Sequence, residues 1–154
     1  IEMLPEAKPL SRSDKILSFE AALAKANAGD AYCQAVVSIY YGLGIECEQD
    51  AAKSKEFVML SAKQQNPLGI YRLAEMRDIG EGMEQNSEQA SQLMQKAKSG
   101  LQKLSGDPYA MTALATIYQK ENPASPKIRE LFTKASEMGY EPAQAKLTQL
   151  ETKQ

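Results

Sequence analysis

The sequence predicts an all-α protein built from stacked pairs of helices, about seven helices in all. Strand-forming residues are scarce, because valine occurs three times in 154 residues while alanine, the strongest helix former, occurs 21 times. Apolar residues recur at helical intervals. The chain also repeats its own plan at a spacing of 36 residues, which is typical of repeat architectures.

The first predicted helix covers residues 13–28. Its apolar stripe consists of Ile16, Phe19, Leu23 and Ala26. We expect Ser11 or Ser13 to cap its start, and Gly29 stands where a left-handed stop belongs. Residues 1–12 are polar and contain two prolines, so they are expected to form an extended leader into this helix.

Later helices carry similar boundary signals. Asp50 and Asn86 are predicted N-caps, since their side chains can accept hydrogen bonds from the first turn. Ser125 followed by Pro126 combines a cap with a first-turn proline. Gly139 is predicted to end another helix.

The repeat defines the organisation of the chain. The segment from Gly29 to Gln65 matches the segment that follows it, a third copy begins at Gly106, and a half-copy begins at Gly139. Matched pairs in the first two copies are Val37 with Leu73, Ser38 with Ala74, and Gly44 with Gly80. The sequence therefore predicts one solenoid domain over residues 13–152, made of a capping helix 13–28, repeats at about 29–65, 66–105 and 106–138, and a terminal helix 139–152.

This plan resembles the Sel-one-like repeats, a family related to the tetratricopeptide repeat. In the second copy the matching positions are Leu73, Ala74, Gly80, Gly82, Asn86, Ala90, Leu93, Lys96 and Ala97. The copy departs from the family where Arg77 replaces a tyrosine, and the third copy lacks the G-x-G turn. Over about residues 14–150, the resemblance implies a right-handed α/α superhelical solenoid. It also implies a role as an adaptor or scaffold, often in a bacterial system.

By analogy with the tetratricopeptide relatives, the first helix of each repeat should line a concave groove that docks a peptide or a partner helix. The residues predicted to face it are Tyr32, Ala35, Ile39, Tyr71, Glu75, Asp78, Tyr109, Thr112 and Thr116. Tyrosine is enriched at interfaces because it combines a broad apolar face with a hydroxyl. For Tyr32 and Tyr109, packing against a neighbouring helix remains the open alternative.

Composition argues against several other functions. The net charge of −2 gives no basic surface for nucleic acid, and no apolar run approaches the roughly 18 residues of a membrane span. The absence of histidine removes Ser–His, Cys–His and His–metal chemistry. The acidic loops lack calcium-binding spacing and are expected to serve helix starts instead; they contain Glu46, Glu48 and Asp50, and Glu81 and Glu84. We therefore expect no enzyme activity, no cofactor and no metal.

Two further possibilities and the compartment stay open. The chain could be a structural spacer or cap of a larger repeat protein, or an enzyme with Cys33 as nucleophile, although no activating base is evident near that thiol. The sequence begins with Ile1 rather than methionine, so a preceding stretch is expected to have been removed. A cleaved export signal would give a periplasmic or secreted protein, and a cytoplasmic location is the alternative.

Overall fold

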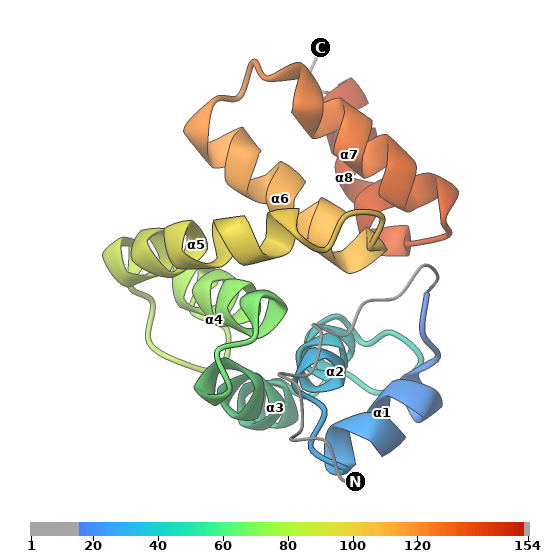
Figure 1. Cartoon of the computed structure of the whole chain (residues 1–154), viewed down its shortest axis with the longest axis vertical. Coiled ribbons are helices and arrows are strands. Elements are labelled where there is room, and N and C mark those ends of the chain that lie inside the picture. The colour runs from blue at the N-terminus through green and yellow to red at the C-terminus, as the bar shows by residue number, and fades with distance from the viewer. Residues whose placement is uncertain (1–15, 153–154) are drawn as a thin grey trace, which may run out of the picture.

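The computed structural model describes residues 16–152, and in that range the chain forms eight α-helices and no strand. They are α1 (Phe19–Asn27), α2 (Ala31–Leu43), α3 (Ala51–Lys63), α4 (Pro67–Ile79), α5 (Ser87–Gln102), α6 (Pro108–Glu121), α7 (Pro126–Glu137) and α8 (Glu141–Thr152). Figure 1 shows α1, α2 and α3 at one end of the longest axis, α4 and α5 in the middle, and α7 and α8 at the other end. The all-α prediction is confirmed. The described residues contain eight helices where about seven were expected.

Side-chain caps begin the helices where the sequence placed them. Asp50 accepts a hydrogen bond from the Lys53 amide at 3.0 Å, and Asn86 accepts one from the Gln89 amide at 2.9 Å. Ser125 caps α7 with Pro126 in the first turn. These three predicted N-caps are confirmed, and each provides an acceptor for an amide that has no partner within its own helix.

The start of the first helix was predicted wrongly. Helix α1 begins at Phe19, with Ser18 as its N-cap, and residues 16–18 are not helical. Ser11, Ser13 and the leader 1–12 lie outside the described residues. The late start has a tertiary cause, because the backbone of Leu17 is held by two tyrosines. Its amide donates to the Tyr109 hydroxyl at 3.0 Å, and its carbonyl accepts from the Tyr40 hydroxyl at 2.6 Å.

The 36-residue repeat is reproduced in backbone detail at the ends of α2 and α4. Gly44 and Gly80, which are repeat equivalents, both adopt the left-handed conformation, with φ of 70° and 75°. Such a φ favours glycine because a Cβ would clash with the backbone. After each glycine the chain returns in the same way. The amide of Asp50 donates to the Tyr41 carbonyl at 2.9 Å. The amide of Asn86 donates to the carbonyl of Arg77, the repeat equivalent of Tyr41, at 2.8 Å.

Consecutive helices form the main contacts of the fold, above all α2 with α3, α4 with α5, and α6 with α7. In addition, α2 contacts α4 and α4 contacts α6, so the first helices of the three pairs form a continuous row. Each of these three helices contains a small residue that is fully buried, namely Ser38 in α2, Ala74 in α4 and Ala115 in α6. This row provides the inner surface on which the candidate site lies.

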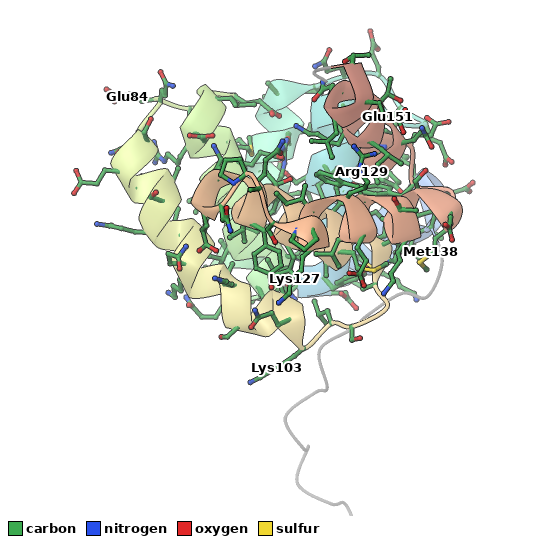
Figure 2. All side chains as sticks on the ribbon, turned by 90° about the horizontal axis from the view of Figure 1, so that it is seen from above. Glu84, Lys103, Lys127, Arg129, Met138 and Glu151 are labelled. Atoms are coloured by element: carbon green, nitrogen blue, oxygen red, sulfur yellow. The ribbon has the colours of Figure 1, made fainter. Side chains whose placement is uncertain are left out.

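Helix α8 closes the stack by packing on α7. Figure 2 shows Arg129 of α7 and Glu151 of α8 on neighbouring ribbons, where their Nη1 and Oε1 atoms lie 3.8 Å apart. Both side chains are exposed, so this pair contributes little to stability. The buried residues Tyr140 and Ala143 hold the start of α8 against the core. Between residues 16 and 152, no helix combines the length and the apolar character needed to cross a bilayer.

Candidate functional site

A groove of about 480 Å³ runs along the first helices of the repeats. Its walls come from α2, α4, α6 and α8, and Ile45 and Glu81 in the turns after α2 and α4 also line it. The lining residues that matter most for its chemistry are Ile39, Leu43, Tyr71, Arg72, Glu75, Ile79, Glu81, Tyr109 and Lys146. The groove therefore gathers on one surface residues from the three repeats and from α8, which lie far apart in the sequence.

The rim of the groove is apolar and accessible. Leu43 and Ile79 line it and are 56% and 62% exposed, which makes them the most exposed large hydrophobic residues between positions 16 and 152. They occupy equivalent positions in the first two repeats, at the last residue of α2 and of α4. Both residues therefore add exposed apolar surface to the same groove.

The floor of the groove contains a buried arginine. Arg72 of α4 is almost fully buried, and each of its nitrogens has a hydrogen-bond partner. Nη1 lies 2.6 Å from Glu75 Oε1, and Nη2 lies 2.5 Å from Glu81 Oε2. Nε and Nη2 also donate to the hydroxyls of Ser38 and Ser54, at 3.2 and 2.9 Å. We refer to Arg72, Glu75 and Glu81 as the ion cluster.

The carboxylates decide the charge state of this arginine. Burial lowers the pKa of Arg72, but Glu75 and Glu81 outweigh that effect, and the net shift is upward. Arg72 is therefore a permanent cation in the groove floor. The neighbouring Tyr71 hydroxyl has a pKa raised well above its usual value, first by burial and then by the charge of Glu75, so it stays neutral and donates to Glu75 Oε2 at 3.3 Å.

The ion cluster has an apolar counterpart in the first repeat. Shifting Arg72, Glu75 and Glu81 back by 36 residues gives Val36, Ile39 and Ile45. The first repeat thus has three aliphatic residues at the positions where the second repeat has three charged residues. Sequence reasoning missed Arg72 and assigned Glu81 to a helix start. A position-by-position comparison of the two copies could have revealed the cluster from the sequence.

Six of the nine predicted site residues line the groove together. They are Ile39, Tyr71, Glu75, Tyr109, Thr112 and Thr116. The remaining three do not. Tyr32 is buried and its hydroxyl donates to Asp107 Oδ2 at 2.5 Å, Ala35 is fully buried, and Asp78 forms an ion pair with Lys120 of α6 at 2.9 Å.

None of the three predicted site tyrosines is exposed, and Tyr32 and Tyr109 pack against neighbouring helices, which is the alternative that the sequence left open. Tyr32, Tyr71 and Tyr109 are each at most 5% exposed. Their rings pack into the stack, and the ring centroids of Tyr109 and Tyr140 lie 4.8 Å apart. Tyr71 and Tyr109 therefore form part of the groove wall, while the accessible edge is aliphatic.

The surroundings of the two cysteines do not favour a reactive thiol. Burial, followed by Asp30, raises the pKa of Cys33 to about 11, and burial also raises the pKa of Cys47. Both shifts disfavour the thiolate that a nucleophile needs.

In the first acidic loop, the Glu46 carboxylate accepts a hydrogen bond from the Phe19 amide at 2.9 Å. Within residues 16–152, no three or more histidine, cysteine, aspartate or glutamate side chains gather as a metal site would require.

Comparison with known proteins gives matches among solved structures alone. No family model matches the sequence, and no curated protein does. A Sel1 repeat protein from Oxalobacter formigenes is similar over 86% of this chain and 48% of its own, with 19% identity and a TM-score of 0.48. A protective antigen of uropathogenic Escherichia coli with an SLR fold is similar over 84% of this chain and 27% of its own, with 26% identity and a TM-score of 0.49.

The structural neighbours are thus Sel1 repeat and SLR-fold proteins, the family that the sequence resembles. This chain spans less than half the length of either neighbour.

Proposed function

We propose that this chain is a non-catalytic protein-interaction module that docks a segment of another protein in the groove between α2, α4, α6 and α8. The observation that carries the proposal is the exposed pair Leu43 and Ile79 at the edge of that groove. Exposed aliphatic residues beside a concave surface favour a partner, because covering them removes apolar surface from water. An adaptor or scaffold role follows from such docking.

The dimensions of the groove favour an extended segment. Its volume of about 480 Å³ lies within the roughly 300–1,000 Å³ of pockets that bury small ligands. An α-helix with its side chains is about 10 Å across, so several turns of it would exceed that volume. A peptide that inserts a few side chains fits better than a helix that enters whole.

Rigidity favours binding in this place. The walls are regular helices, and buried tyrosines of different repeats pack against one another between them, so little ordering is needed when a partner arrives. Binding to a preformed surface avoids part of the entropy that association costs. The groove is therefore suited to recognise short segments without a large rearrangement.

A peptide-display experiment tests the proposal. The whole chain is used to select from a library of random dodecapeptides, beside two variants, Leu43→Ser/Ile79→Ser and Met59→Ser/Leu60→Ser. Met59 and Leu60 of α3 are similarly exposed, at 46% and 44%, but do not line the groove, so they form a matched control. Serine removes apolar surface without adding charge, and circular dichroism confirms that both variants stay helical.

We expect the native chain and the α3 variant to enrich the same peptides, and the rim variant to lose them. Equal enrichment by both variants would move the binding surface away from the groove. No enrichment by the native chain would overturn the docking function and favour the structural spacer instead.

A further inference from the structure

The ion cluster carries more negative than positive charge. Arg72 can neutralise one carboxylate, but it is bound by two, Glu75 and Glu81. The arginine side chain is 2% exposed, whereas those of Glu75 and Glu81 are 34% and 18% exposed. The surface that the cluster offers to a ligand therefore consists mainly of carboxylate oxygens. Glu81 Oε1 accepts no hydrogen bond from any side chain or amide that the structure describes.

The fold does not require these charges. In the first repeat the equivalent positions are Val36, Ile39 and Ile45, and two of those, Ile39 and Ile45, line the same groove. Aliphatic residues therefore satisfy the packing of a helix pair at this place. A buried ion cluster loses hydration and is often no more stable than apolar residues of similar size. Its presence in the second repeat is better explained by recognition than by packing.

The remaining charges of the groove do not cancel the excess. Helix α8 contributes Glu141, which is exposed, and Lys146, which forms no ion pair with a described residue. The groove therefore holds three carboxylates, those of Glu75, Glu81 and Glu141. It holds two cations, Lys146 and the buried Arg72. The other lining residues are uncharged, and a protein wall screens charge less than water does.

Resting on the docking function proposed above, we infer that the bound segment presents a lysine or arginine side chain to Glu75 and Glu81, next to an apolar side chain that covers Leu43 and Ile79. A basic group supplies charge-assisted hydrogen bonds to carboxylates that binding would otherwise desolvate. An acidic segment would be repelled, and a purely apolar one would leave the one excess negative charge of the cluster uncompensated. The partner is therefore recognised by a basic residue beside an aliphatic one.

Single substitutions test this charge requirement without disturbing the fold. Glu75→Gln or Glu81→Gln leaves Arg72 with one carboxylate and makes the cluster neutral, while the amide oxygen can still accept from the guanidinium. Glu56→Gln/Glu137→Gln serves as a control, since both residues are exposed and lie outside the groove. Thermal melts confirm that each variant is folded before the dodecapeptide library is selected on it.

We expect the native chain and the control to enrich peptides with lysine or arginine at one fixed position, at least several-fold above the library frequency. Each single variant should lose that preference. For a synthetic copy of the most enriched peptide, replacing the basic residue by glutamine should weaken Kd roughly 10- to 100-fold for the native chain and much less for Glu81→Gln.

The outcomes separate the two proposals. Peptides that need Leu43 and Ile79 but show no basic preference would overturn this inference and leave the docking function intact. A preference that persists in both single variants would also overturn it, because the excess carboxylate would then not be its cause. Absence of any peptide that depends on Leu43 and Ile79 would overturn both.

Discussion

The hydroxyl oxygens of Tyr40 in α2 and Tyr109 in α6 lie 2.5 Å apart, which joins the first repeat directly to the third. Tyr40 uses its hydrogen on the Leu17 carbonyl, so Tyr109 donates to Tyr40. The Leu17 amide in turn donates to Tyr109. Three hydrogen bonds therefore form a closed ring among two repeats and the segment before α1, and this ring ties the ends of the helix row together.

Removing one hydroxyl of the ring should destabilise the protein. Tyr109→Phe leaves the Leu17 amide and the Tyr40 oxygen without their partners in a buried place, which costs about 1–3 kcal/mol of unfolding free energy. Urea denaturation followed by circular dichroism measures the change. Tyr118→Phe is the control, because the Tyr118 hydroxyl accepts from Gln102 in exposed surroundings, and its effect should stay within about 0.5 kcal/mol. Equal losses of unfolding free energy for Tyr109→Phe and Tyr118→Phe would show that the ring of hydrogen bonds does not stabilise the fold.

Alkaline pH should weaken the fold through the same tyrosines. Burial raises the pKa of Tyr32, Tyr40 and Tyr109 above the usual value near 10. Above about pH 10 the unfolded chain therefore releases protons that the folded chain retains, so stability is fully present below that pH and falls as the pH rises. Each tyrosine adds a slope of up to about 1.4 kcal/mol per pH unit. Urea midpoints between pH 8 and 11.5 should show a shallower decline for Tyr40→Phe/Tyr109→Phe than for Tyr118→Phe, and parallel declines would refute this origin.

The ion cluster should behave as a unit in stability measurements. Arg72→Val leaves two partly buried carboxylates without a cation and should lower the unfolding free energy by about 3 kcal/mol. Arg72→Val/Glu75→Ile/Glu81→Ile copies the residues of the first repeat, Val36, Ile39 and Ile45, and should return to within about 1 kcal/mol of the native value. A triple variant that is less stable than the single one would show that the second repeat needs its charges for packing.

The two thiols should differ in reactivity. Cys33 is buried with a pKa of about 11, so roughly one molecule in ten thousand carries its thiolate at pH 7. Titration of the native protein with an aromatic disulfide reagent should label Cys47 first and reach Cys33 only after urea is added. Cys33→Ser identifies the slow thiol. Rapid labelling of Cys33 in the native state would revive its role as a nucleophile.

Local features of the fold could be predicted because each depends on a few consecutive residues. The caps Asp50, Asn86 and Ser125 need one side chain and the following turn, and the left-handed Gly29 and Gly139 need one backbone angle. The pairing of helices could be predicted from the repeat, since equivalent residues occupy equivalent places.

Features that depend on contacts between repeats could not be predicted in the same way. Ser18 rather than Ser11 or Ser13 caps α1, because hydroxyls from α2 and α6 hold Leu17 out of the helix. The burial of Tyr32 depends on Asp107, 75 residues further along the chain. Neither contact leaves a periodic signal in the sequence.

The residues that line the groove could be predicted only in part, because their orientation also depends on contacts between repeats. The first helix of each repeat does line it, but helix rotation decides which residues face inward, and that rotation follows from the packing of neighbouring pairs. Arg72 was overlooked because a single arginine within a helix usually points to solvent. Its burial becomes visible when Glu75 and Glu81 are brought beside it.

An NMR titration tests the central claim, that the groove is the docking surface, most directly. The ¹⁵N- and methyl-labelled chain is titrated with a synthetic copy of the peptide that the display selection enriches most. If the groove is the docking surface, saturable shifts are expected for Leu43, Tyr71, Glu75, Ile79 and Glu81, with Met59 and Leu60 of α3 unchanged. Shifts confined to the outer helices α3, α5 and α7, with the groove resonances unmoved, would contradict it.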